Sequence, residues 1–301
     1  MRLVEDGPGA PMWVDSELDA RLEAQQLLTG RQVYLGAATG GVISLHRGDV
    51  VLDVGANVGS FARLAAGLVG RSGRVLALEP LPQVFEALRR NAAMWATAAA
   101  GADIDAAVIE PVHAGVVSMA NAASGSAHFT YFPKCAALST LLATRDDADA
   151  LQATTSIVRN DPAPAVTTLQ RAARRLARFA PWLYGFVHTA IFRLLYLRGA
   201  QTVRCPVLSL NEVIDRHNVR QVSLLKINVE RGELGVLLSL DRAHWLQVDQ
   251  VSMQLHDRGE ALSEAERVLR ETAGFACVRS FKEPRFRDCC LVQVVASRKA
   301  T

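Results

Sequence analysis

The most constraining feature of this 301-residue chain is a strand-turn-helix pattern at residues 50–61, which read VVLDVGANVGSF. The apolar run at 50–52 predicts a buried strand, Asp53 follows at its exit, and Gly55 and Gly59 lie in the turn before the next helix. Because glycine has no Cβ atom, such a turn lets a ligand lie against the backbone. The pattern therefore predicts a pocket for a nucleoside-like ligand at the carboxyl end of this strand.

The spacing of the glycines separates two classes of ligand. A dinucleotide site has the pattern G-x-G-x-x-G, but from Gly55 the later glycine positions hold Asn57 and Ser60, which opposes a dehydrogenase. The pattern D-x-G-x-N-x-G suits a ligand without phosphates, such as S-adenosylmethionine, whose cationic end Asp53 could face. Glu79 ends a second apolar run and could accept hydrogen bonds from both ribose hydroxyls, because a carboxylate only accepts. The alternative is a glycine turn that serves only the packing of the protein.

The residues that we expect to bind S-adenosylmethionine are Asp53, Gly55, Ala56, Asn57, Gly59, Glu79 and Pro80.

Composition argues against several other classes of protein. Half of the residues are hydrophobic, the net charge is only +3, and the 33 basic residues are scattered, so we expect a sizeable core and no nucleic-acid partner. The five cysteines are odd in number and show no C-x-x-C spacing, which favours neither a disulfide framework nor a zinc site. The N-terminus lacks the basic and apolar regions of a signal peptide, so a cytoplasmic location is expected.

Apolar strands alternate with amphipathic helices along most of the chain, which predicts an α/β fold with a parallel sheet. The strands are expected at 50–54, 74–79, 222–229 and 250–256, with less regular candidates at 106–109, 114–118 and 127–132. The helices are expected at 60–69, 83–94, 209–217, 233–240 and 263–273, with a further one at 16–28 that would cover the mouth of the pocket. Strands at 277–281 and 291–296 would close the sheet as an antiparallel edge pair.

Residues 139–200 interrupt this alternation, and we interpret them as a helical insertion or lid. Their second half carries arginines before an apolar run at 179–197, in which Pro181, Gly185 and Arg193 argue against a membrane span. The simpler alternative is a helical cap with one buried face. The expected organisation is an N-terminal helical lead or cap at 1–48, a main domain made of 49–138 and 201–301, and the insertion at 139–200.

A second group of polar residues follows two other predicted strands. Lys226, Asn228 and Glu230 alternate with apolar residues at the end of one, and His256 and Asp257 end the next. Open parallel sheets bind ligands at this edge, and histidine can take a proton near neutral pH. Lys226 could act on a ligand, or it could be structural and pair with Glu230 or with the acid at position 233.

Taken together, these segments resemble the FkbM-type methyltransferases. The resemblance covers about residues 50–297, apart from most of 145–200. It is carried by VLDVGANVG from residue 51, Glu79-Pro80, FTYFP at 129–133, LSLNEVI at 208–214, the segment 225–237 and Leu255-His256-Asp257. The F-T-Y-x-P, K-I-N-V-E-R-x-E and H-D elements are most similar to the branch that accompanies polyketide and nonribosomal-peptide biosynthesis, whereas many other relatives are assigned to sugars.

The resemblance implies a Rossmann-like class I methyltransferase fold, with a mostly parallel seven-stranded sheet, an antiparallel edge strand and a helical insertion. It implies transfer of a methyl group from S-adenosylmethionine to a hydroxyl of a small polyketide-like acceptor, with a sugar as the alternative acceptor and no metal required. In this scheme His256 is the base, and Lys226 stabilises the developing alkoxide or positions a substrate carbonyl. Asn228 and Glu230 orient the acceptor, and Asp257 is a further catalytic candidate beside them.

Three positions depart from the family pattern. Many relatives read K-I-D-V-E-G where this chain has Asn228 and Arg231, and Gln254 replaces an acid often seen before the His-Asp pair. These changes remove negative charge or add positive charge. If relatives use the aspartate as a base or metal ligand, that role would fall here to His256, Asp257 or Glu230. A second hypothesis is therefore a non-catalytic cofactor-binding or interaction protein, whose arginines at 171–178 would bind an acidic carrier protein or, peripherally, an anionic membrane surface. The simpler alternative for these arginines is a solvated helix face.

Overall fold

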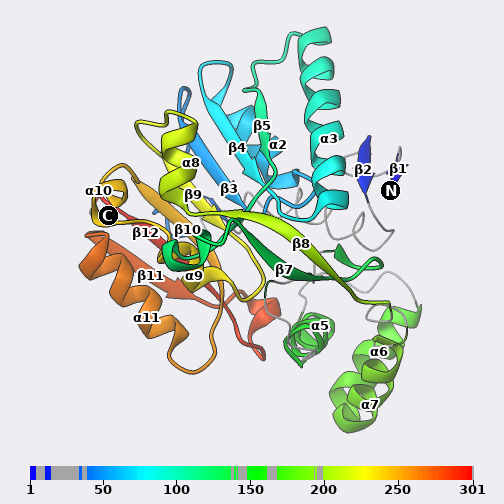
Figure 1. Cartoon of the computed structure of the whole chain (residues 1–301). Helices are drawn as coiled ribbons and strands as arrows, with labels where there is room; N and C mark the ends of the chain where they lie inside the picture. The colour runs from blue at the N-terminus through cyan, green and yellow to red at the C-terminus, as the bar shows by residue number, and fades with distance from the viewer. Residues whose placement is uncertain are drawn as a thin grey trace.

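The centre of the protein is a twisted seven-stranded sheet (Figure 1). The computed structural model describes residues 1–4, 11–14, 34–35, 39–136, 139, 141, 148–160, 168–192, 194 and 199–299. The strands of the sheet, in spatial order, are β11 (Cys277–Phe281), β12 (Leu291–Ser297), β10 (Gln250–His256), β9 (Leu224–Ile227), β3 (Val50–Val54), β4 (Arg74–Leu78) and β5 (Ile109–Val112). The pairings from β10 to β5 are parallel, and β12 runs antiparallel to both β10 and β11. The expected antiparallel pair at the edge is therefore confirmed, with β12 second from that edge.

Helices bury both faces of the sheet. One hydrophobic core joins the sheet to α2 and α3, and the other joins it to α8, α9 and α11. Side chains of a strand alternate between faces, so Val51 enters the first core and Leu52 the second. The helices are α2 (Ser60–Val69), α3 (Pro82–Gly101), α4 (Met119–Ala122), α8 (Leu210–Arg216), α9 (Glu233–Leu237), α10 (Arg242–Trp245) and α11 (Ala261–Arg267), the last continued by a π-helical turn at Val268–Thr272.

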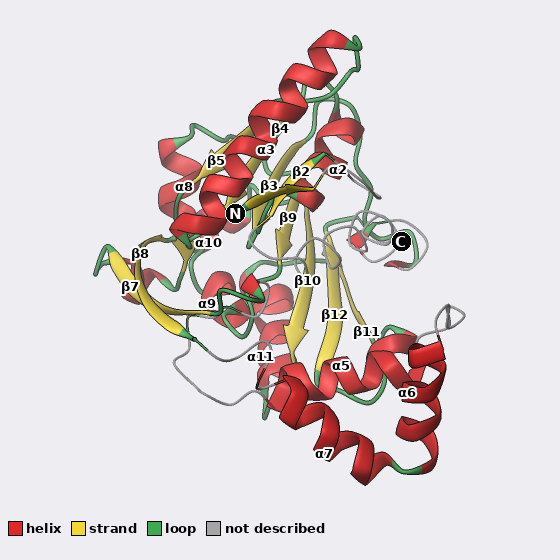
Figure 2. Cartoon of the chain, turned by 90° about the vertical axis from the view of Figure 1, so that its right-hand side faces the viewer, coloured by secondary structure: helices red, strands yellow, loops and turns green. Residues whose placement is uncertain are grey.

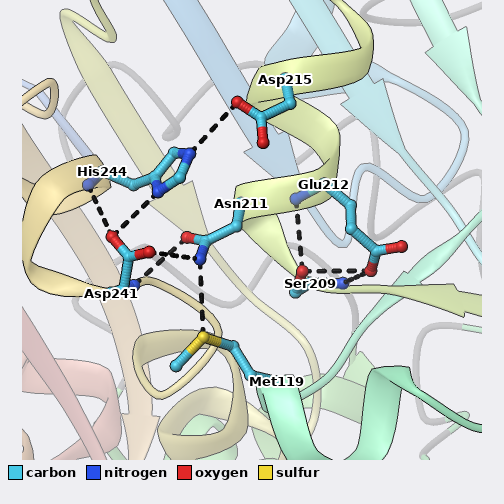
Figure 3. Close-up of polar contacts among 7 residues, drawn as sticks. All are labelled: Met119, Ser209, Asn211, Glu212, Asp215, Asp241 and His244. Carbon is cyan, nitrogen blue, oxygen red and sulfur yellow. Dashed lines mark hydrogen bonds and ion pairs between the residues drawn. The ribbon is translucent and has the colours of Figure 1, made fainter.

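Helix α8 begins with a capping box, which Figure 3 shows. The Glu212 N–H donates to Ser209 Oγ at 3.2 Å, and the Ser209 N–H donates to Glu212 Oε2 at 2.9 Å. Asn211 and Asp241 connect this helix to α10. Asn211 Nδ2 donates to Asp241 Oδ2 at 3.0 Å, and Asp241 also accepts from the His244 N–H at 2.9 Å. These hydrogen bonds hold α8 and α10 together on the face of the sheet that α8, α9 and α11 cover.

Two strands differ from the sequence-based prediction. The predicted strand at 106–109 is wrong, since β5 spans Ile109–Val112 at the edge of the sheet. Glu110 and Pro111 interrupt the apolar pattern by which this strand could have been predicted. An edge strand tolerates proline, and Glu110 Oε1 accepts a hydrogen bond from Arg74 Nε at 2.9 Å. The strand β8 (Gln201–Leu208) was not predicted. It pairs with β6 (Gly115–Val116) and with β7 (Ser126–Tyr131) in a separate three-stranded sheet.

The segment 139–200, which we interpret as an insertion, contains three described helices, α5 (Ala148–Asn160), α6 (Thr168–Phe179) and α7 (Pro181–Phe192). Figures 1 and 2 show α6 and α7 as a hairpin at the periphery of the molecule, with α5 between this hairpin and the sheet. Helix α5 is fixed by Ser156 Oγ, which donates to the Arg285 carbonyl at 2.8 Å in a 3₁₀ turn at Pro284–Phe286. Within the described residues, no helix has both the length and the apolar character that crossing a bilayer requires.

At the N-terminus, β1 (Arg2–Val4) and β2 (Met12–Val14) form a two-stranded antiparallel sheet. The Trp13 N–H donates to Asn91 Oδ1 on α3 at 2.7 Å, which fixes β2 to that helix. The predicted helix at 16–28 lies outside the described residues.

Candidate active site

The carboxyl edge of the parallel strands gathers the polar residues that the sequence analysis selected. Asp53 lies in β3, Glu79 directly follows β4, Lys226 lies in β9, and His256 ends β10. The register places Asp53 beside Lys226, and Lys226 beside Ser252 of β10. Residues far apart in the sequence therefore form one edge, although their roles in binding and catalysis stay predictions.

Asp53 and Lys226 form a buried ion pair. Lys226 Nζ donates to Asp53 Oδ1 at 2.7 Å and to the Gly55 carbonyl at 3.0 Å, and both side chains are almost completely buried. The ammonium also lies 5.7 Å from the ring of Tyr34 and 5.6 Å from that of Phe61, within the range of cation–π attraction. The suggested pairing of Lys226 with Glu230 or the acid at position 233 is thus wrong, and the ammonium is engaged on the cofactor side of the edge.

The second oxygen of Asp53 has a different environment. Among the residues that the structure describes, Asp53 Oδ2 is buried without a hydrogen-bond partner. A buried acceptor without a donor is costly, so such atoms in folded proteins require an explanation. A cationic ligand group at this edge would supply one.

Glu79 is buried at the end of the neighbouring strand and already holds two backbone donors. Its Oε2 accepts from the Asn57 N–H at 3.1 Å, and its Oε1 accepts from the Leu81 N–H at 3.0 Å. Burial raises the pKa of Glu79 to about 7, although these two hydrogen bonds oppose the shift. Each carboxylate oxygen retains a further lone pair, so the group can accept two more hydrogen bonds.

The two glycines of the turn lie against other parts of the protein. Gly55 has φ +74°, and a Cβ atom there would lie 1.9 Å from the Asn228 carbonyl oxygen. Gly59 has φ +96°, and its Cβ would lie 2.7 Å from Leu88 Cδ1. Packing within the protein therefore requires glycine at these positions, and at Gly55 the close neighbour is the backbone after β9. Whether the two glycines also make room for a ligand stays a prediction.

The remaining predicted cofactor residues serve the turn itself. The Ala56 N–H donates to the Leu78 carbonyl at 2.9 Å, and Asn57 has φ +51°, a conformation that asparagine tolerates well. The Pro80 carbonyl lies 3.0 Å from Nε2 of His113. These contacts hold the backbone that presents Asp53 and Glu79 at the edge.

Tyr34 lies against the residues of this edge, and the sequence analysis did not select it. Its hydroxyl lies 3.4 Å from Asn228 Nδ2, its carbonyl accepts from Ser252 Oγ at 3.2 Å, and its ring makes an edge contact with Phe61 at 5.3 Å between centroids. Among the described residues, Asn228 Oδ1 is buried without a hydrogen-bond partner. No motif surrounds Tyr34, so only its aromatic character in a polar N-terminal segment could have pointed to it.

His256 lies between two carboxylates rather than in position to accept a proton. Its Nδ1 lies 2.9 Å from Glu233 Oε1, and its Nε2 lies 3.4 Å from Glu230 Oε2. Burial alone would lower the pKa of His256, but the hydrogen bonds to Glu230 and Glu233 raise it to about 10. A protonated imidazole has no lone pair to accept a proton, so this arrangement favours a positioning role for His256, and its expected role as the base stays a prediction.

We expect the His256 imidazole to stay protonated from pH 6 to 8, which NMR of its ring protons can measure. Since folding raises this pKa from 6.5 to about 10, the protonated ring stabilises the fold below about pH 6.5, and the contribution is lost as the pH rises toward 10. The free energy of unfolding should fall more steeply between pH 7 and 10 in the wild type than in His256→Gln. The exposed His46, replaced in His46→Gln, is the control. A ring titration near pH 6.5 for His256 would contradict the double ion pair and restore the residue as a base.

The loop that carries Glu230 has an unusual backbone. Glu230 has φ +47° and Arg231 has φ +73°, both in the left-handed region that favours glycine. Position 231 is the one at which many FkbM relatives have glycine, so the departure noted in the sequence occurs where the backbone conformation is least suited to arginine.

Arg231→Gly is accordingly expected to stabilise the protein by about 0.5–1 kcal/mol, because relief of left-handed strain exceeds the added chain entropy of glycine. Urea unfolding measures the change, and Arg220→Gly is the control, because Arg220 is exposed and does not have a positive φ. A loss of stability equal to that of the control would show that the backbone at 231 is not strained.

Asp257 follows His256 at the end of β10 and is half-buried. Its N–H donates to the Cys290 carbonyl at 2.8 Å, which connects this strand end to the loop that α5 contacts. Its carboxylate stays a candidate for the acceptor side of the site.

Comparison with known proteins identifies the family. A family model described as the methyltransferase FkbM domain matches residues 53–276. The 31-O-demethyl-FK506 methyltransferase FkbM of Streptomyces tacrolimicus is 30% identical over 258 residues, which cover 86% of this chain and 84% of that protein. The methyltransferase sdnD of Sordaria araneosa is 24% identical over 250 residues, covering 80% of this chain and 79% of that protein.

Among solved structures, a methyltransferase FkbM from Methylobacillus flagellatus KT matches with a TM-score of 0.45 and 11% identity, covering 90% of this chain and 51% of that one. The family model and the Streptomyces relative, rather than this structural likeness, decide the assignment. The chain belongs to the FkbM family and is an S-adenosylmethionine-dependent methyltransferase.

Proposed function

We propose that this protein binds S-adenosylmethionine at the edge formed by β3 and β4, and methylates a hydroxyl group of a small polyketide-like acceptor. The observation that supports binding of the methyl donor is the pair of acids at this edge. Asp53 Oδ2 is a buried acceptor without a donor among the described residues, and Glu79 can accept two more hydrogen bonds. An ammonium and a ribose diol are the donors that such a pair fits.

The residues present are compatible with this cofactor, which supplies an electrophilic methyl group. Lys226 neutralises one oxygen of Asp53 and leaves the other for the ligand's cationic end. Glu79 binds the ribose, and the backbone N–H groups of Asn57 and Leu81 hold its carboxylate in place.

On the acceptor side, Glu230 is the better candidate for the base. It is 30% exposed and can contact an acceptor, whereas Glu233 is almost fully buried. A carboxylate in contact with a substrate hydroxyl can remove the proton as the methyl group is transferred, a contribution worth roughly 10²–10⁴-fold in rate. His256 then acts as a positioning residue.

The choice of an oxygen atom in a polyketide-like molecule rests on the relatives. The name of the Streptomyces relative specifies an oxygen of FK506. Methyl transfer from labelled S-adenosylmethionine to polyketide alcohols, in parallel with free sugars, tests the acceptor class. Labelling of sugars alone would replace the proposal with glycan methylation.

Calorimetry of S-adenosylmethionine binding tests the donor site. We expect Glu79→Gln to weaken binding about 10- to 100-fold, because charge-assisted hydrogen bonds contribute about 1.5–3 kcal/mol. Since the pKa of Glu79 is about 7, its ionised fraction rises between pH 6 and 8, so wild-type affinity should increase over this range and the affinity of Glu79→Gln should not. Glu86→Gln on α3, where Glu86 pairs with arginines at the surface, is the control. Equal affinities of wild type and Glu79→Gln would remove Glu79 from the site.

A further inference from the structure

The hairpin of α6 and α7 carries a cluster of exposed aromatic side chains. Phe179 is 79% exposed, Trp182 76% and Phe186 75%. Large apolar residues rarely gather on a protein surface unless they bind something. We call Phe179, Trp182 and Phe186 the aromatic cluster.

The exposure does not come from unpacked helices. Helices α6 and α7 pack on each other and on α5, and their inner side chains Ala177, Tyr184 and Phe192 are buried. The hairpin therefore has a filled inside and an apolar outside. Figure 2 shows that it lies at the edge of the molecule, away from the central sheet.

The outer surface of α7 offers almost no hydrogen-bonding groups. Every described side chain of α7 that is exposed is apolar: Trp182, Phe186, Val187, Ala190 and Ile191. A protein interface needs about one hydrogen bond per 100–200 Å², whereas the acyl region of a membrane needs none. This surface suits a lipid environment better than a protein partner.

Positive charge borders the aromatic cluster. The segment 168–194 contains five arginines and no acidic residue, so it carries more positive charge than the net +3 of the whole chain. Arg171, Arg175 and Arg178 are exposed on α6, and Arg175 lies one helical turn before Phe179 on the same side of the helix. Two copies of this surface would carry the same positive charge, and this like-charge repulsion opposes self-association.

We propose that the α6–α7 hairpin binds the surface of an anionic lipid bilayer. The aromatic cluster enters the boundary between headgroups and acyl chains, and the arginines of α6 contact lipid phosphates. With 12 residues, α7 is too short to cross a hydrocarbon layer that needs about 20, so the hairpin lies in the interface. This association is independent of the reaction at the carboxyl edge.

The test is co-sedimentation of the full chain with vesicles. We expect binding to phosphatidylcholine vesicles that contain about a third phosphatidylglycerol, little binding to pure phosphatidylcholine, and weaker binding as salt is raised. Trp182→Ser/Phe186→Ser and Arg175→Gln/Arg178→Gln should each reduce partitioning at least tenfold. Leu246→Ser/Arg242→Gln, which changes an exposed leucine and a nearby arginine at α10, should bind like the wild type.

Circular dichroism and urea unfolding of each variant establish that it is folded before its binding is compared. Binding to anionic vesicles that the hairpin variants leave unchanged would overturn the proposal, and so would no binding at all. A dimer in sedimentation velocity that Trp182→Ser/Phe186→Ser dissociates would assign the surface to a second copy instead. Tight binding of an acidic carrier protein without vesicle binding would assign it to a protein partner.

Discussion

Gly55→Ala is expected to lower the free energy of unfolding by about 3 kcal/mol or more and to abolish measurable S-adenosylmethionine binding. The new methyl group would lie 1.9 Å from the Asn228 carbonyl oxygen, and the backbone at φ +74° is itself strained for alanine. Left-handed strain costs about 1–2 kcal/mol and overpacking typically 1–3 kcal/mol. Because the neighbour is backbone, it cannot rotate away, so β3 and β9 would have to separate at their carboxyl ends.

The matched control is Gly67→Ala. Gly67 lies in α2, does not have a positive φ, and a methyl group added there would meet no atom of the described residues within 4 Å. Alanine is a better helix former, so this variant should gain about 0.5–1 kcal/mol. Urea unfolding compares both variants with the wild type. If Gly55→Ala proved as stable as Gly67→Ala, the close approach of the two strand ends would not exist in solution.

Lys226→Met is the second substitution with a large expected effect. It leaves the Asp53 carboxylate buried without its cation, and breaking a buried ion pair in this way costs about 3–5 kcal/mol. The double variant Asp53→Asn/Lys226→Met removes both charges and should recover most of the lost stability, because the two sites form one pair. Lys134→Met at an exposed lysine is the control and should change stability by less than about 0.5 kcal/mol.

The coupling free energy between Asp53 and Lys226 can be measured with a double-mutant cycle, by urea unfolding of the four proteins. Asp53→Asn alone, the fourth corner, leaves the ammonium buried near Tyr34 and Phe61 and should also be destabilising. Additive losses in the double variant would mean that Lys226 does not act through Asp53. In that case its ammonium would be available for the acceptor, as the sequence analysis expected.

The interior strands of the sheet could be predicted because their apolar residues follow clear patterns. Val50–Val54 is a nearly continuous apolar run whose side chains enter both cores, whereas the apolar residues of Gln250–His256 alternate with polar ones and enter one core. The edge strand at Ile109–Val112 and the half-exposed strand at Gln201–Leu208 carry polar residues and proline, which weaken the same signal. Prediction failed where proline and charged or polar residues interrupt a partly buried strand.

The residues of the site could be predicted better than their partners. Strand ends bring acids to one edge, so the placement of Asp53 and Glu79 there could be predicted without coordinates, while their role in binding stays a proposal. The partner of Lys226 depends on the register between strands 173 residues apart, which no local pattern encodes. The protonation of His256 likewise depends on two carboxylates that a loop with left-handed residues brings to its ring.

The contact between Gly55 and the carbonyl of Asn228 also limits how this enzyme can be redesigned. Libraries that vary the loop after β9 to obtain new acceptors would move the support of the cofactor turn, so many members would lose the donor before any acceptor is tried. Selections for altered specificity should therefore keep the backbone at 228 fixed, retain Glu230 and Glu233, and diversify the other side chains from 231 onward. Insertions in that loop belong after position 231, beyond the point where the two halves of the site are in contact.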